Sequence, residues 1–169
     1  MSLILLADDS PHALRMGEQI LREEGYEVVC APGGTEAVRW LAAVRPDVII
    51  ADAFLPGLSG ADLCRQVRSG SPHTRVILTA GSTEDLDPAA ARTLGGDAFL
   101  RKPFEASLVT VTVAPLARQA LEARSAAAPA RTEEIQALKI QALVARKVEE
   151  ELPRFVDEIT RKVLLALAG

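Results

Sequence analysis

Five polar side chains that could act together on a phosphoryl group lie at the carboxyl ends of short apolar runs. They are Asp8, Asp9, Asp52, Thr79 and Lys102. Clustered carboxylate oxygens are suitable ligands for Mg²⁺, which binds few protein carboxylates and keeps phosphate oxygens and water in its other positions. A lysine can hold a phosphate oxygen as a point charge, and a threonine hydroxyl can donate to another. The set favours a phosphoryl-accepting site with Asp52 as the nucleophile.

Each of these residue types also has an ordinary structural use. An aspartate that follows a strand often forms a turn or caps a helix. A threonine within a strand, or a lysine on the surface, needs no special role. The joint placement of the five side chains nevertheless favours one site, because ligands of open α/β sheets bind at the carboxyl ends of the strands.

The elements that must position these side chains are five short apolar runs separated by helical patterns. Val48-Ile49-Ile50 and Val76-Ile77-Leu78 are continuous apolar stretches, which are typical of strands covered on both faces. Alternation of strand and helix predicts an α/β fold with a doubly wound, five-stranded parallel sheet. The runs cover residues 3–7, 27–31, 47–51, 75–80 and 98–101, and the helical patterns cover 10–25, 35–44, 60–68, 87–94 and 105–124.

Four segments carry a resemblance to a known family. They are LLADDS at 5–10, DVIIADAFLPGLSG at 47–60, LTA at 78–80 and GDAFLRKPF at 96–104, in this order and spacing. On these motifs, residues 1–124 closely resemble the receiver domain of bacterial two-component response regulators (CheY-like proteins). The resemblance implies a flavodoxin-like strand order. It also implies that Asp52 receives a phosphoryl group from a histidine kinase or a histidine phosphotransfer protein.

The resemblance implies further roles at the strand ends. Asp9 and Asp52 would ligate Mg²⁺, and Asp8 would act mainly through water. The backbone carbonyl of Phe54 would be the third protein ligand of the metal. Lys102 would contact the phosphoryl group.

Thr79 and Phe99 match the pair that carries the conformational switch in this family. A phosphoryl oxygen on Asp52 would attract the Thr79 hydroxyl, the loop after it would move in, and the Phe99 ring would turn into the vacated space. Phe99 could instead be an ordinary aromatic residue of the core, and it could also have both roles. The resemblance also implies that the peptide bond from Lys102 to Pro103 is cis.

The remaining residues have a different pattern. Residues 125–132 are interpreted as a linker, although an alanine-rich extension of the preceding helix up to Pro129 is also possible. Residues 133–169 are interpreted as a C-terminal helical extension, either two helices broken near Pro153 or one kinked helix, because proline inside a helix costs about 3 kcal/mol. Residues 131–169 contain seven Lys/Arg and seven Asp/Glu, which argues against a DNA-binding arm. The helices either fold back onto the first part, form a homodimer or dock on a downstream protein.

Composition limits the function class. With 49% apolar residues, 25% charged residues and a net charge of −4, the chain is typical of a soluble globular protein without affinity for nucleic acid. Cys30 and Cys64 fit neither a metal motif nor a disulfide framework. The apolar start is too short for a signal peptide or membrane insertion, so a cytoplasmic location is expected.

We therefore expect a phosphoacceptor signalling protein, not an enzyme, that acts as a response regulator of a phosphorelay. Its C-terminal helices would pass the signal on by dimerisation or by docking on a partner. The alternative is a scaffold or assembly protein that uses the receiver fold for docking and in which phosphorylation is minor.

Overall fold

A computed structural model describes the backbone of residues 2–167, with the side chains of residues 2–127 and of some later positions. The chain divides into two compact units, Met1–Arg124 and Ser125–Gly169. The boundary between the units falls at the residue where the resemblance to a receiver domain ends.

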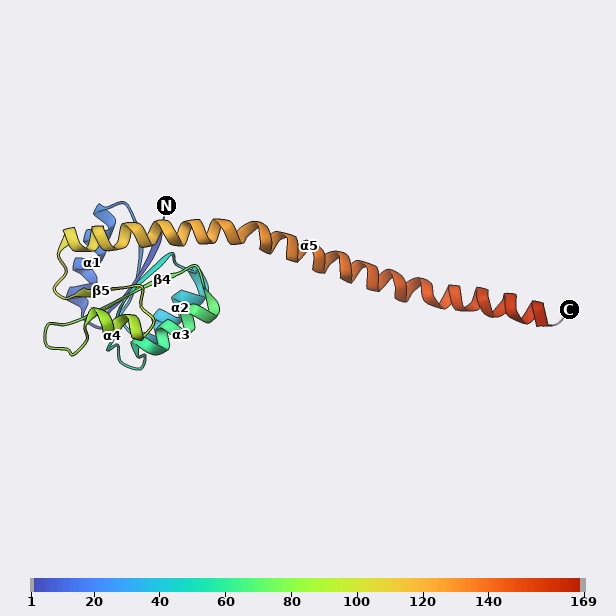
Figure 1. Cartoon of the computed structure of the whole chain (residues 1–169), viewed down its shortest axis with the longest axis horizontal. Coiled ribbons are helices and arrows are strands. Elements are labelled where there is room, and N and C mark those ends of the chain that lie inside the picture. Colours follow the sequence, from blue (N-terminus) through green and yellow to red (C-terminus); the bar gives the residue numbers. More distant parts are fainter. Residues whose placement is uncertain (1, 168–169) are drawn as a thin grey trace. The chain divides into compact units, whose positions relative to one another are not determined.

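A five-stranded parallel sheet forms the middle of the first unit (Figure 1). All five residues of the central strand are buried, as the continuous apolar run Val48-Ile49-Ile50 predicts. The strand order β2-β1-β3-β4-β5 confirms the doubly wound α/β fold and the flavodoxin-like order. The strands are β1 (Leu3–Ala7), β2 (Glu27–Ala31), β3 (Val48–Asp52), β4 (Arg75–Ala80) and β5 (Ala98–Arg101).

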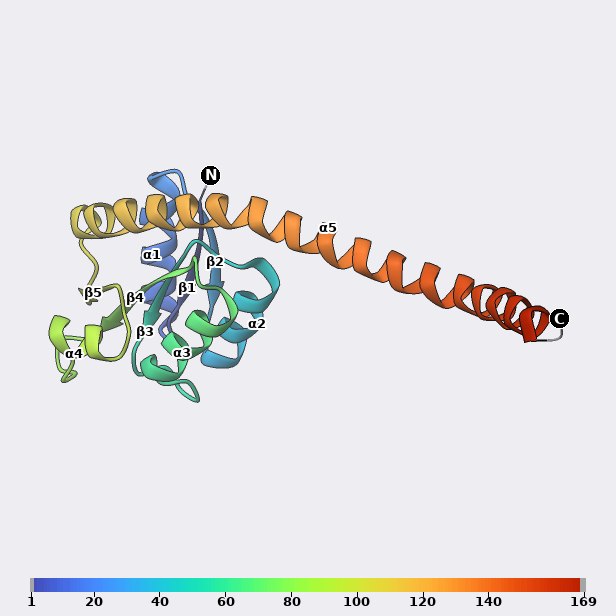
Figure 2. The ribbon, with the colours of Figure 1, turned by 45° about the vertical axis from the view of Figure 1, so that its right-hand side comes forward.

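Helices cover both faces of the sheet (Figure 2). One face carries α1 (Pro11–Glu23) and the part of α5 (Ala106–Leu167) that belongs to the first unit. The other face carries α2 (Gly34–Val44), α3 (Gly60–Gly70) and α4 (Pro88–Thr93). Two apolar clusters result, one on each face of the sheet.

Alternation along β1 shows how one strand serves both clusters. Ile4 and Leu6 pack toward α1 and α5, whereas Leu5 and Ala7 pack toward α2 and α3. Successive side chains of a strand point to opposite faces, so a strand between two helical layers must be apolar throughout.

Serine caps fix the starts of the two helices that follow β1 and β3. The Ser10 hydroxyl accepts from the amide of Ala13 at 3.3 Å, and the Ser59 hydroxyl accepts from the amide of Asp62 at 3.1 Å. Such caps satisfy amides that the first turn of a helix leaves without partners. They also define where the short loops after β1 and β3 must end.

The second unit agrees with the alternatives of an extended and kinked helix and not with a linker followed by two separate helices. The helix α5 runs from Ala106 to Leu167 without interruption, through residues 125–132 and past Pro153. Alanine has the highest helix propensity, and the segment Ala126-Ala127-Ala128 extends the helix where a linker was expected.

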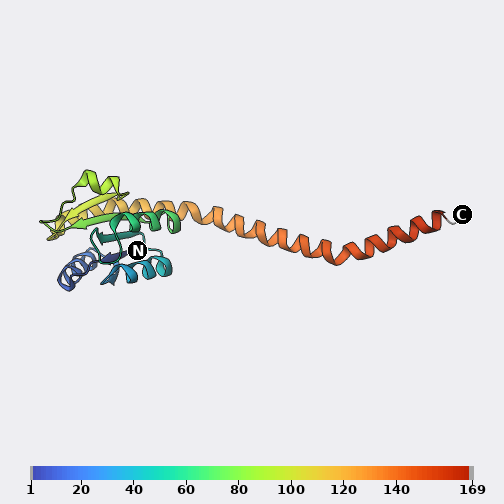
Figure 3. The same ribbon diagram turned by 90° about the horizontal axis from the view of Figure 1, so that it is seen from below.

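Within the second unit, the late part of α5 bends in its orange-red portion (Figure 3). A bend is the usual effect of a proline inside a helix, because the ring clashes with the preceding turn. Pro153 is therefore accommodated in a continuous helix. Within the described residues, no helix is both long enough and apolar enough to cross a membrane.

Candidate functional site

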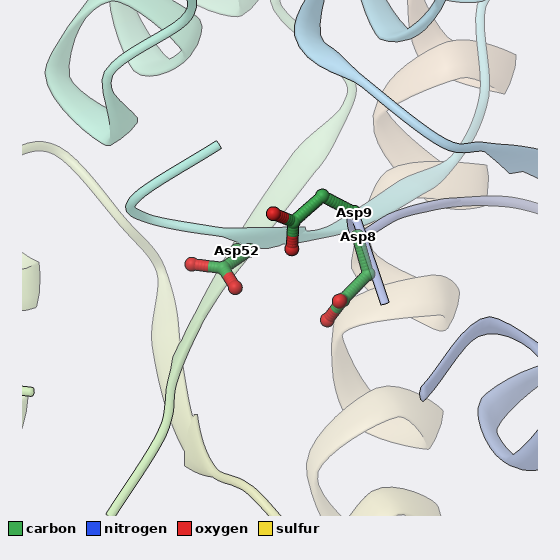
Figure 4. Close-up of side chains that lie close together, drawn as sticks. All are labelled: Asp8, Asp9 and Asp52. Carbon is green, nitrogen blue, oxygen red and sulfur yellow. The ribbon is translucent and has the colours of Figure 1, made fainter. Parts of the chain in front are cut away.

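Three carboxylates from two neighbouring strands gather at one edge of the sheet (Figure 4). Asp8 and Asp9 follow β1, and Asp52 ends β3, which pairs directly with β1. One oxygen atom from each carboxylate lies within 4.8 Å of the others. Asp8 and Asp52 are 1% and 5% exposed, whereas Asp9 faces solvent. The structure thus brings these three residues together at one edge of the sheet.

Backbone amides orient the two buried carboxylates. The Oδ1 atom of Asp8 accepts from the amide of Ser10 at 2.9 Å, and the Oδ1 atom of Asp52 accepts from the amide of Phe54 at 2.8 Å. Aspartate commonly makes this bond to the amide two residues later, which shapes a tight turn. The ordinary turn-forming role of these aspartates is therefore present, and each still has a second oxygen for other partners.

Lys102 supplies that second partner for both buried carboxylates. Its Nζ atom donates to Oδ2 of Asp8 at 2.9 Å and to Oδ2 of Asp52 at 2.5 Å. Burial lowers the pKa of Lys102, but the hydrogen bonds and charges of Asp52 and Asp8 outweigh it, and the pKa lies above its usual value of 10.5. The ammonium group is therefore charged at neutral pH.

The chain around Lys102 fixes the direction of this long side chain. The amide of Lys102 donates to the carbonyl of Ala80 at 2.9 Å, which continues the pairing of β5 with β4. The peptide bond from Lys102 to Pro103 is cis, as the resemblance to receiver domains implies. Lys102 thus stands at the same sheet edge as the carboxylates, although it is far from them in sequence.

The composition of this cluster fits a divalent cation. Three carboxylates face one ammonium group, so two formal negative charges are left without a counter-charge within the set. The donors are hard oxygen atoms, which suit Mg²⁺. The backbone carbonyl of Phe54 stays a predicted ligand.

Thr79 lies beside Asp52 and has a buried hydroxyl group. It is the register partner of Asp52 across β3 and β4, and it is 1% exposed. Among the described residues, its Oγ1 atom has no hydrogen-bond partner. Leaving a buried hydroxyl without a partner costs about 1–3 kcal/mol. A phosphoryl oxygen on Asp52 would give this hydroxyl an acceptor.

Phe99 does not join the carboxylate cluster. It lies on β5, is half-buried and packs against the cluster of residues that faces α2, α3 and α4. The guanidinium carbon of Arg101 stands 5.0 Å from the centre of its ring. Sequence reasoning missed Arg101, because an arginine at the end of a strand has no pattern that separates it from a solvated surface residue.

A cavity of about 340 Å³ opens beside Lys102. Its wall combines the start of α1 with the loops after β4 and β5, and it includes His12, Met16, Gly81 and Phe104. Lys102 itself is part of this wall.

Comparisons with known proteins agree with this geometry. The family model described as the response regulator receiver domain matches residues 4–114. The probable transcriptional regulatory protein TcrX of Mycobacterium tuberculosis is 34% identical over 116 residues, which cover 69% of this chain and 50% of TcrX. The DNA-binding response regulator MtrA of Mycolicibacterium smegmatis is 35% identical over 102 residues, which cover 60% of this chain and 44% of MtrA. The chain spans about half the length of these curated relatives.

Solved structures show the same fold. A response regulator receiver domain protein from Clostridium thermocellum has a TM-score of 0.63 at 28% identity, covering 74% of this chain and 98% of that protein. The chemotaxis response regulator CheY4 of Vibrio cholerae has a TM-score of 0.62 at 29% identity, covering 69% and 98%. With a family match over more than half of its length, the chain belongs to the response regulator receiver domain family of two-component systems.

Proposed function

We propose that Asp52 accepts a phosphoryl group, with Mg²⁺, from a histidine kinase or a histidine phosphotransfer protein. The observation that carries this proposal is the convergence of Asp8, Asp9 and Asp52 with Lys102 at one sheet edge. Asp52 is itself the acceptor, so the chain is a phosphoacceptor signalling protein and not an enzyme with a separate substrate.

Transfer of the phosphoryl group needs no reactant besides the phosphohistidine and Asp52. A carboxylate oxygen of Asp52 attacks the phosphorus atom of a phosphohistidine, a phosphorus–oxygen bond forms, and the phosphorus–nitrogen bond breaks with its electron pair going to the imidazole. Lys102 leaves Asp52 and holds a phosphoryl oxygen. When held by Asp9, Asp52 and the Phe54 carbonyl, with Asp8 acting through water, Mg²⁺ would offset the charge of the phosphoryl oxygens.

The new phosphoryl group then acts on Thr79 and Phe99. The unpartnered hydroxyl of Thr79 donates to a phosphoryl oxygen, and the loop that follows β4 moves with it. The half-buried ring of Phe99 would then turn inward. A change of charge at Asp52 thereby changes the surface around α4, β5 and α5.

The second unit supplies the output in this proposal. Exposed apolar side chains form a stripe along the helix, with steps of three or four residues apart from the adjacent pair Phe155 and Val156. Each is 47–62% exposed, and they are Ile140, Val144, Val148, Leu152, Phe155, Val156, Ile159 and Val163. Such a stripe favours a homodimer or a downstream protein as its partner. The names of relatives such as MtrA include DNA binding, but the equal numbers of acidic and basic residues after residue 130 favour protein contacts here.

A phosphodonor experiment tests the acceptor role. Native protein incubated with acetyl phosphate and Mg²⁺ is expected to gain the mass of one phosphoryl group, and Asp52→Asn is expected to gain none, because an amide oxygen is a poor nucleophile. Intact-protein mass spectrometry measures both. An adduct that forms equally on Asp52→Asn, or none on the native chain, contradicts the proposal and favours the scaffold alternative.

The apolar stripe of the second unit predicts an effect on self-association. Val148 and Ile159 lie on one face of the helix, eleven residues and about three turns apart. Val148→Glu combined with Ile159→Glu is expected to weaken a dimer tenfold or more, since burying each side chain contributes about 1.5–3 kcal/mol. Sedimentation equilibrium measures the dissociation constant.

Arg161→Glu is the matched control, because residue 161 lies on the opposite face of the helix. A native chain that is monomeric with and without the phosphoryl group excludes the dimer and leaves docking on another protein as the output. Equal dissociation constants for all three proteins contradict the assignment of this stripe.

A further inference from the structure

One arginine side chain holds the loop that follows Thr79. Arg101, the last residue of β5, donates from Nη1 to the carbonyl of Gly81 at 2.8 Å and to that of Glu84 at 3.0 Å. Its Nη2 atom donates to the carbonyl of Leu86 at 2.6 Å. A planar guanidinium with several fixed donors can satisfy three carbonyls at once, which an ammonium group cannot do with the same geometry. The loop 81–86 is therefore fastened to the end of β5.

The same guanidinium group also covers Phe99. Its central carbon stands 5.0 Å from the ring centre, within the range of a cation–π contact. Phe99 is two residues before Arg101, so both side chains leave the same face of β5. One side chain thus contacts the loop on one side and the aromatic ring on the other.

The loop has a further internal tie. The carboxylate of Glu84 accepts from the amide of Gly81 at 2.5 Å. Gly81 lies two residues after Thr79, whose buried hydroxyl has no partner among the described residues. The Thr79 hydroxyl thus lies just before a loop whose carbonyl groups are bound by Arg101 and not by Thr79.

We infer that Arg101 is a positioning residue that holds loop 81–86 and Phe99 in the arrangement of the unphosphorylated protein. This inference rests on the proposed function of Asp52 and Thr79. Movement of the loop toward a phosphoryl group must break or reorganise the three hydrogen bonds of Arg101, and rotation of Phe99 must alter its contact with the guanidinium group. Arg101 joins the two movements and opposes both until the phosphoryl group is present.

Beryllofluoride, a tetrahedral mimic of a phosphoryl group, gives a direct test. Native protein and Arg101→Ala are titrated with beryllofluoride in the presence of Mg²⁺, and binding is followed by amide NMR. Arg101→Ala is expected to bind about tenfold more tightly, because the cost of releasing the loop is no longer part of the binding equilibrium. Arg101→Lys keeps the positive charge but loses the planar set of donors. Its affinity for beryllofluoride is expected to lie between those of native protein and Arg101→Ala.

A second pair of variants separates positioning from general structure. In a Thr79→Val background, Arg101→Ala is expected to leave the affinity unchanged, because the hydroxyl that draws the loop inward is gone. Arg68→Ala is the matched control: Arg68 donates to the carbonyl of Gly95 at 3.1 Å and to Asp97 at 3.0 Å, on a different loop. It should lower the free energy of unfolding without changing the affinity.

Two sets of results separate the role of Arg101 from the role of the phosphoryl site. Equal or weaker binding by Arg101→Ala, with tight binding by native protein, overturns the role of Arg101 alone. So does an affinity gain of the same size in the Thr79→Val background. Failure of native protein to bind beryllofluoride, or equal binding by Asp52→Asn, overturns the proposed phosphoryl site instead.

Discussion

Lys102→Met is expected to lower the free energy of unfolding by about 2 kcal/mol without divalent cations, and saturating Mg²⁺ is expected to restore most of it. Lys102 is the partner of Asp8 and of Asp52, which are almost fully buried. Removing one partner of a buried pair costs about 3–5 kcal/mol. A smaller loss of unfolding free energy is expected here because the Lys102 side chain is 19% exposed. A cation that binds only the folded state restores stability by mass action. Urea unfolding with and without Mg²⁺ measures both effects.

The same variant is expected to slow phosphoryl transfer from acetyl phosphate roughly a hundredfold, because a positive group that stabilises the transferred oxygens is lost. Its affinity for Mg²⁺ should rise, since an ammonium group no longer competes with the metal for the carboxylates. Lys102→Arg keeps a positive charge and is the control for stability. Unchanged stability in Lys102→Met, or weaker Mg²⁺ binding, contradicts the assignment of this cluster.

The pH dependence of this stabilisation has a definite sign. The pKa of Lys102 is raised above 10.5 in the folded protein. The contribution of its ion pairs is therefore complete below the unfolded-state pKa and is lost as the pH rises through the higher folded-state value. The difference in stability between native protein and Lys102→Met should be constant near neutral pH and shrink in alkaline solution. Unfolding at a series of pH values checks this.

The carboxylate cluster could be predicted from the sequence because two rules act together. Continuous apolar runs such as Val48-Ile49-Ile50 mark buried parallel strands, and parallel strands bring their carboxyl ends to one edge. Asp8 and Asp52 therefore had to approach each other without any knowledge of side-chain contacts. The register of Thr79 beside Asp52 follows from the same topology.

The contacts of Arg101 could not be predicted in this way. They depend on the path of the loop 81–86, whose residues follow no period and whose carbonyls point toward β5 only in the folded chain. The sequence alone leaves the course of α5 open for a different reason. Pro129 and Pro153 disfavour the helix locally and the alanines between 126 and 130 favour it, and a local cost does not by itself end a helix.

Arg124→Ala is expected to lower the free energy of unfolding by about 2 kcal/mol, because Arg124 is the ion-pair partner of the buried Asp47. Asp47 lies directly before β3 and is completely buried, and its Oδ2 atom accepts from the amide of Leu3 at 3.0 Å. Its Oδ1 atom has no hydrogen bond within the described residues and forms an ion pair with Arg124 at 2.9 Å. Removing the arginine leaves a buried charge without its counter-charge.

The variant Asp47→Asn separates the contribution of the Arg124 charge from the contribution of packing by its alkyl chain. Asparagine keeps an acceptor for Leu3 and needs no counter-charge, so Arg124→Ala should cost much less in the Asp47→Asn background than in native protein. The difference between the two costs is the coupling energy of the pair, and urea unfolding of the four proteins measures it. Because the Arg124 side chain is 43% exposed, water offsets part of the loss, and a value near 2 kcal/mol is expected instead of the full cost of a buried pair. Equal costs in both backgrounds would show that Asp47 does not need Arg124 and that its burial is tolerated through Leu3 alone.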